Sequence, residues 1–192
     1  MLTTKDKILD SVISFIKDEP TLKQVSMSQI AERAGIGKST VYDYFETKDA
    51  LVEETYLYLF DKYHKILLQE IDMTSYKETM IRQLSLILEV VEDAKIIMEA
   101  IMAAQNELVV FNYKHCSTKI QSIQKAMEIR FGQIFILGTQ ENIIHVTNKP
   151  YASNIIQALI SGLMFQYTDG KIDISRQGLL ELIYEEMVKV LN

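Results

Sequence analysis

Apolar residues recur every three or four positions along most of this chain, and few residues interrupt the pattern. The first such stripe includes Ile8, Val12 and Ile16, which would lie on one face of an α-helix. Only 7 of the 192 residues are glycine and 2 are proline, so helix-breaking positions are scarce. The helical spacing of apolar residues and the low number of glycines and prolines together predict an all-α protein of about nine helices.

Capping residues predict where these helices begin and end. Ser26 and Ser75 are each followed three residues later by Gln or Glu, the spacing of a capping box at a helix start. Pro20 and Gly35 predict the ends of the first two helices. From the apolar stripes we expect further helices at about residues 38–45, 47–71, 75–104, 109–127, 150–167 and 175–191.

Residues 134–146 fit two structures. Two short apolar runs, 134–137 and 143–146, flank the polar sequence Gly-Thr-Gln-Glu-Asn, and this arrangement is typical of a β-hairpin. The surrounding chain has helical spacing, which favours a helix. The sequence alone does not decide between the hairpin and the helix.

The charge distribution limits the kinds of partner. The net charge is -6, and nonspecific coating of nucleic acid requires many basic residues to neutralise phosphates. Residues 1–50 contain seven Lys or Arg against eight Asp or Glu, whereas the remainder has 13 against 18. The acidity therefore lies mostly outside the first fifty residues, and any basic patch must be local.

The single cysteine, Cys116, excludes an intrachain disulfide and any zinc site that needs two thiolates. The first residues are charged, and no run of about 18 apolar residues occurs. We therefore expect a cytoplasmic protein with no membrane segment, no metal and no cofactor.

Residues 26–51 carry the most informative pattern. They comprise two short helices around a glycine turn, with a further helix behind them. The small side chains of Ala31 and Ala34 allow the helices to approach closely, and Gly35 supplies the positive φ of a sharp turn. Such a helix-turn-helix can present its second helix to a DNA major groove. Its small core would contain Ile30, Ile36, Val41 and Phe45.

These residues resemble the TetR family, also called TetR/AcrR. Residues 30–51 read Ile-Ala-x-x-Ala-Gly-Ile-x-Lys-x-x-Val-Tyr-x-Tyr-Phe-x-x-Lys-Asp-x-Leu, an ungapped match to the family signature. The resemblance implies a three-helix DNA-binding domain at residues 1–47. It also implies a larger helical domain for ligand binding and dimerisation at residues 48–192, where the likeness lies in helical layout alone.

By position in the motif, the resemblance also implies which side chains face DNA. Lys38 and Lys48 stand at helix starts, where the helix dipole disfavours a cation by roughly 0.3 to 1 kcal/mol. A bound phosphate would reverse that penalty. The alternative is that both lysines are solvated and the tyrosines are packed. The implied DNA contacts are Ser26, Ser28, Lys38, Ser39, Thr40, Tyr42, Tyr44 and Lys48.

Two positions depart from what DNA binding favours. Asp43 places an acid on the recognition helix, where it either accepts a hydrogen bond from cytosine or points away from the phosphates. Gly37 stands where a serine is often found, which leaves a weaker helix cap.

For the second half, the resemblance implies a pocket among the middle helices. Methionines there would adapt to an irregular, largely apolar effector, although each of these residues could equally be ordinary core. The candidate pocket residues are Tyr63, His64, Leu84, Met102, Tyr113, His115 and Met127.

The resemblance further implies a homodimer formed by the last two helices, whose apolar faces could equally be intramolecular core. The candidate interface residues are Ile155, Leu159, Gly162, Leu163, Leu180, Ile183 and Met187.

The expected function is thus a ligand-responsive transcription regulator, a repressor that a small apolar effector releases from a palindromic double-stranded operator. The competing classes are a helical adaptor without DNA binding and an all-helical enzyme. The sequence contains none of the common catalytic motifs, such as Gly-x-Ser-x-Gly or a phosphate loop, so we do not expect an enzyme.

Overall fold

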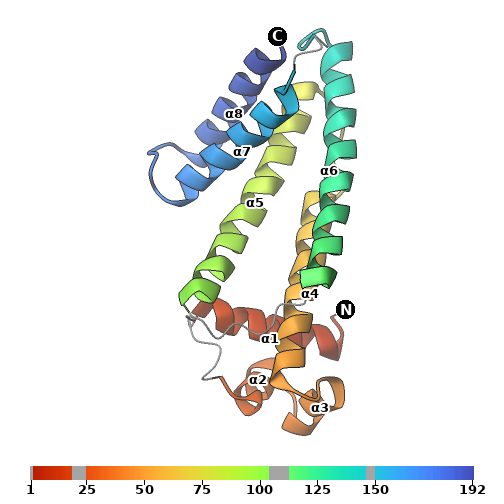
Figure 1. Ribbon diagram of the computed structural model, residues 1–192, viewed down its shortest axis with the longest axis vertical. Coiled ribbons are helices and arrows are strands. Elements are labelled where there is room, and N and C mark those ends of the chain that lie inside the picture. Colours follow the sequence, from red (N-terminus) through yellow and green to blue (C-terminus); the bar gives the residue numbers. More distant parts are fainter. Residues whose placement is uncertain (1, 19–24, 104–112, 146–149) are drawn as a thin grey trace. The chain divides into compact units, whose positions relative to one another are not determined.

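The computed structural model describes residues 2–18, 25–103, 113–145 and 150–192, with side chains omitted at 98–103 and 113–117 (Figure 1). The prediction of an all-α protein is confirmed, and the described residues form eight helices rather than about nine. The helices are α1 (Thr4–Asp18), α2 (Met27–Ala34), α3 (Lys38–Tyr44), α4 (Lys48–Leu67), α5 (Tyr76–Ala103), α6 (Tyr113–Gln140), α7 (Ala152–Thr168) and α8 (Arg176–Leu191).

Local capping determines where several helices start. Ser26 caps α2, and the Ser75 hydroxyl accepts a hydrogen bond from the Glu78 amide at the start of α5 (3.3 Å). α4 ends at Leu67, earlier than the predicted residue 71. The predicted end of the first helix at Pro20 lies outside the described residues.

α6 resolves the ambiguity at residues 134–146. The helix continues through Gln140 and is followed by a turn, so the described part of this segment forms no hairpin. Gly138 lies inside the helix, where its lack of a side chain lets the Tyr76 ring pack directly against it. A Cβ atom at Gly138 would stand only 2.7 Å from that ring.

The chain divides into two compact units. Unit 1 comprises residues 1–64 and 94–122, and unit 2 comprises residues 65–93 and 123–192. α4, α5 and α6 each contribute residues to both units. The predicted functional boundary between residues 47 and 48 stays a prediction.

The core of unit 1 joins α1, α2, α3 and the first part of α4. The apolar stripe of α1 packs on α2, and α2 packs on α3. Burying each large apolar side chain contributes roughly 1.5 to 3 kcal/mol, so this core is the main stabilising term of the unit. The core residues at its centre are Ile8, Val12, Ile30, Val41 and Leu51.

The core of unit 2 joins α5, the second part of α6, α7 and α8. α7 packs along α8, and one face of each is buried. The Tyr76 and Tyr184 rings meet with their centroids 5.6 Å apart. The core residues at its centre are Met80, Leu84, Ile134, Met164, Leu179 and Ile183.

Two glycines of α6 provide a matched test of this packing. Gly138→Ala should lower the free energy of unfolding by about 1 to 2 kcal/mol, because the added methyl group collides with Tyr76. Gly132→Ala should raise it by up to about 1 kcal/mol, because alanine is the better helix former and a Cβ there meets nothing within 4 Å. Urea denaturation of the two variants checks both signs. Equal effects would show that Tyr76 does not pack closely at Gly138.

Candidate DNA-binding site

The start of α2 is held by a reciprocal capping box. The Ser26 hydroxyl accepts a hydrogen bond from the Gln29 amide (3.3 Å), and the Gln29 carboxamide oxygen accepts one from the Ser26 amide (2.8 Å). The first orphan amides of the helix are thereby satisfied. Ser26 and Ser28 are both exposed, so they can meet a ligand from the start of α2.

A glycine turn connects α2 to α3. Gly35 has φ of 68° and ψ of 34°, the left-handed conformation that side chains disfavour. Its amide donates to the Glu32 carbonyl (3.0 Å), and the Ile36 amide donates to the Ala31 carbonyl (3.0 Å). This pair of bonds is a Schellman motif, which ends α2 and turns the chain sharply into α3.

α3 has one inward and one outward face. Val41 is 0% exposed, and Phe45, just after the helix, is 5% exposed, so these two side chains anchor it in the core. Tyr42 and Tyr44 are 45% and 48% exposed. The predicted contacts Lys38 and Ser39 are also exposed, and Thr40 is half-buried, so this short helix turns a polar and aromatic surface outward.

Lys38 and Tyr42 lie one turn apart on that surface. The Lys38 ammonium is 5.8 Å from the centre of the Tyr42 ring, within the range of a cation–π contact. A cation beside an aromatic ring combines attraction for phosphate with a flat face for a base or sugar. Asp43, the unfavourable acid, is exposed on the same helix.

Lys48 begins α4 and is half-buried. Burial lowers the pKa of its amine, and the neighbouring Asp49 carboxylate acts in the opposite direction. Thr47 caps the helix by accepting a hydrogen bond from the Ala50 amide (3.1 Å). The sequence predicts Lys48 at the start of a helix, and the structure places it there, with its side chain half-buried.

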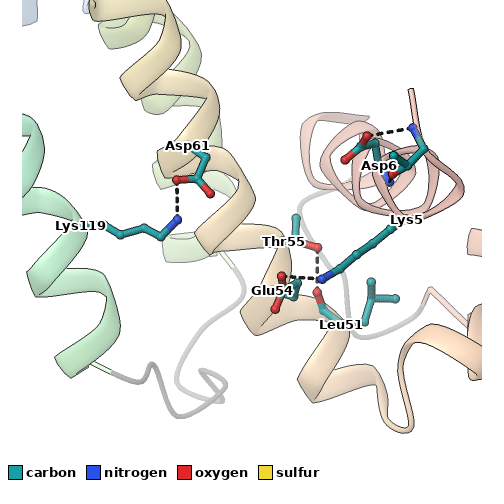
Figure 2. A network of polar contacts seen from close by, with 8 residues as sticks. Lys5, Asp6, Leu51, Glu54, Thr55, Asp61 and Lys119 are labelled. Atoms are coloured by element: carbon teal, nitrogen blue, oxygen red, sulfur yellow. Dashed lines mark hydrogen bonds and ion pairs between the residues drawn. The ribbon is translucent and has the colours of Figure 1, made fainter. Parts of the chain in front are cut away.

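Polar contacts attach α1 and α6 to α4 at the edge of the unit 1 core. Figure 2 shows the Lys5 ammonium of α1 reaching the Glu54 carboxylate of α4 (2.8 Å), and Lys119 of α6 paired with Asp61 of α4. Such exposed pairs contribute about 0 to 1 kcal/mol each, so they orient the helices more than they stabilise them.

Arg33 is the basic residue of α2, and its contacts point away from the outward face of α3. It pairs with Asp18 of α1 (2.7 Å), and its guanidinium lies 3.4 Å from the centre of the Phe15 ring. Arg33 therefore joins α2 to α1, which agrees with its absence from the predicted DNA contacts.

The structure distributes the candidate pocket residues over both units. Tyr63 and His64 are half-buried in unit 1, and Tyr63 packs against its core. In unit 2, Leu84 is completely buried in the core and Met127 is half-buried. The side chains of Met102, Tyr113 and His115 lie outside the described residues.

The candidate dimer residues also fall into two groups. On α7, Ile155 is 50% exposed, Leu159, Gly162 and Leu163 are half-buried, and a Cβ at Gly162 would meet nothing within 4 Å. On α8, the candidates are buried in the core of their own unit, which is the intramolecular alternative that the sequence leaves open. These α8 residues are Leu180, Ile183 and Met187.

Gln83 of α5 and Arg130 of α6 are not among the site residues predicted from the sequence. Gln83 is completely buried, although glutamine is usually exposed. The signal for Gln83 is its position beside the apolar stripe of Met80, Leu84 and Ile87. Both side chains bond to backbone carbonyls at the end of α4.

Comparison with known proteins shows which proteins this site is similar to. Residues 22–55 match the family model described as bacterial regulatory proteins, tetR family. Over these residues the chain is similar to the TetR family. This match covers α2, α3 and the start of α4, and it supports the predicted helix-turn-helix DNA-binding region. No curated protein matches the chain.

Solved structures of TetR-family transcriptional regulators share the fold over nearly the whole chain. One from Haemophilus influenzae has 18% identity and a TM-score of 0.62, covering 98% of this chain and 96% of its own. One from Streptomyces coelicolor has 17% identity and a TM-score of 0.64, covering 97% and 81%. One from Thermus thermophilus has 13% identity and a TM-score of 0.58, covering 100% and 97%. At these identities the likeness concerns the fold alone.

The described parts of the chain contain neither a membrane-spanning helix nor a cluster of metal-binding side chains. No helix there is long and apolar enough to span a membrane. No group of three or more His, Cys, Asp or Glu side chains there is arranged to hold a metal ion.

The two glycines around the start of α3 should respond oppositely to the same substitution. Gly35→Ser should lower the free energy of unfolding by about 1 to 2 kcal/mol, because serine must adopt the left-handed conformation. Gly37→Ser should raise it by a few tenths of a kcal/mol, because Gly37 is an N-cap with φ of -69° and no side-chain cap. Thermal melts followed by circular dichroism check the signs, and two destabilised variants would contradict the turn geometry.

Proposed function

We propose that this protein is a homodimeric, ligand-responsive repressor of the TetR family, which a small, largely apolar effector releases from a palindromic operator. The observation that carries the proposal is the outward face of α3, with Lys38, Tyr42 and Tyr44 exposed and Val41 buried behind them. A major groove admits an α-helix, and cationic and aromatic side chains on its outward face can contact phosphates and base edges. Such a repressor needs access to chromosomal DNA, so the proposal includes a cytoplasmic location.

The predicted contacts divide by position into two kinds. Ser26 and Lys48 stand at the starts of α2 and α4, where phosphates would set the register of the protein on DNA. Tyr42 lies on the outward face of α3, where a side chain can reach base edges or the methyl group of thymine. Phosphate contacts therefore supply affinity, and the α3 contacts supply sequence preference.

One face of α7, half-buried except for the exposed Ile155, supports dimerisation. Ile155, Leu159, Gly162 and Leu163 recur with spacings of four, three and one, which places them on one side of the helix. Ile155 is exposed, and the open space at Gly162 allows a partner helix to approach closely. A two-fold dimer would pair this face with its copy and present two recognition helices to two half-sites.

Substitutions on the two kinds of DNA contact should differ in selectivity. Lys48→Ala should weaken binding to the operator and to random DNA about equally and reduce the salt slope by about one unit, because one phosphate contact is lost. Tyr42→Ala should weaken operator binding more than random binding, because it removes base readout. Gel shifts at several salt concentrations measure both quantities.

Lys125→Ala is the matched control, because Lys125 is an exposed lysine of α6 and should leave both affinities unchanged. An unchanged salt slope in Lys48→Ala would remove that residue from the phosphate contacts.

A charge on the α7 face should separate the dimer. Ile155→Lys should give monomers in sedimentation velocity, because a buried unpaired ammonium opposes association, while the isolated fold tolerates it at an exposed position. Ile136→Lys on α6, where the isoleucine is 60% exposed, is the control and should leave the dimer intact. If Ile136→Lys gave monomers and Ile155→Lys left the dimer intact, the interface would lie on α6 and not on α7.

A further inference from the structure

Two side chains of unit 2 hold the end of α4. The Gln83 carboxamide of α5 donates a hydrogen bond to the Leu67 carbonyl (3.0 Å). The Arg130 guanidinium of α6 donates to the Leu68 carbonyl (3.2 Å) and to the Gln69 carbonyl (3.3 Å). The last carbonyls of a helix have no partner within the helix itself. Here Gln83 satisfies the carbonyl of Leu67, and Arg130 binds two carbonyls just beyond the end of α4.

The carboxamide of Gln83 forms hydrogen bonds through its NH2 group but not through its oxygen. Its side chain is completely buried, and its oxygen Oε1 has no hydrogen-bond partner among the described residues. The orientation of the amide follows from the Leu67 carbonyl, which accepts and so requires the NH2 group to face it. A buried acceptor without a partner is unfavourable, and such groups are uncommon in folded proteins.

We propose that Oε1 of Gln83 is the polar contact for the effector of this protein. The ligand class is an apolar small molecule carrying a neutral hydrogen-bond donor, a hydroxyl or an N–H group. This inference rests on the proposed function in one respect, namely that the protein responds to a small molecule.

The surroundings of Gln83 select for such a ligand. On α5, Met80 lies three residues before it and Leu86 three residues after it, and both are buried. The Met127 sulfur of α6 is 3.9 Å from the Gln83 nitrogen. Methionine side chains rearrange readily to admit irregular apolar shapes. A cation would lose its hydration in such apolar surroundings, so a neutral donor fits better.

Tyr76 carries the other buried polar atom without a partner in the described residues, its hydroxyl oxygen. Its ring is packed against Gly138 on α6 and against the Tyr184 ring on α8. Rigid neighbours of this kind leave less scope for rearrangement than the methionine beside Gln83. The geometry therefore favours Gln83 over Tyr76 as the ligand contact.

The position of Gln83 also connects ligand binding to α4. One planar carboxamide carries both the NH2 group that holds Leu67 and the oxygen that would meet the effector. A ligand that reorients this group acts directly on the last turn of the helix that begins at Lys48. It shifts the equilibrium only by its differential affinity for the two arrangements.

Matched probes test the contact without knowledge of the natural effector. Straight-chain primary alcohols from hexanol to dodecanol are compared with their isomeric methyl ethers, which have similar apolar bulk but no donor. Dissociation constants are measured by calorimetry on the full chain. In at least one pair the alcohol should bind about fivefold more tightly than the ether.

Gln83→Met should bring the two dissociation constants of that pair to parity, because methionine keeps the length of the side chain and removes the amide. Gln133→Met makes the same change at an exposed position of α6 and should preserve the preference. If every alcohol and its isomeric ether had equal dissociation constants in the unmodified protein, the proposal would be overturned without any variant. A preference that survives in a folded Gln83→Met protein would overturn it as well.

These binding measurements involve no DNA, so they separate the two hypotheses. A protein that selects DNA but shows parity in every pair keeps its proposed function and loses this contact. A protein that prefers the alcohol through Gln83 but selects no DNA keeps the contact and loses the regulator function.

Discussion

The burial of Val41 and Phe45 in the core of unit 1 is the constraint on which the DNA-binding surface depends. α3 has seven residues, and an isolated helix of that length is not stable in water. Its conformation is therefore maintained by packing against the helices around it. Because the side of α3 that bears Val41 is buried in the core, the side that bears Tyr42 must face outward.

The turn at Gly35 determines the direction of that surface. Its left-handed conformation ends α2 and lets Ile36 pack against the core, so α3 begins at a defined angle. Ion pairs such as Lys5 with Glu54 help to orient the helices at the edge of the same unit. The apolar core supplies most of the stabilisation.

The sequence could predict the features of the structure that depend on local signals. The capping residue Ser26, the terminating Gly35 and the inward Val41 act within a few positions, so their pattern is readable along the chain. Long-range packing was not readable. The apolar face of α8 was clear, but the sequence could not tell whether Ile183 meets its own core or a second copy, and the structure places it in its own core.

Gln83 illustrates the same limit, because its meaning depends on the Leu67 carbonyl sixteen residues earlier and on Met127 of another helix. Residues 134–140 show a third case, in which short apolar runs suit either a strand or a helix. Packing of Gly138 against Tyr76 accompanies the helix that forms. What the sequence leaves open in each case is the identity of a distant partner.

The central claim is that the outward face of α3 reads duplex DNA. The most direct measurement is to incubate the purified protein, without effector and at low ionic strength, with fragmented genomic DNA and to sequence the bound fraction. The account predicts recovery of fragments that share an inverted repeat, with half-sites about one helical turn apart. Recovery of no fragment above random competitor DNA would contradict it.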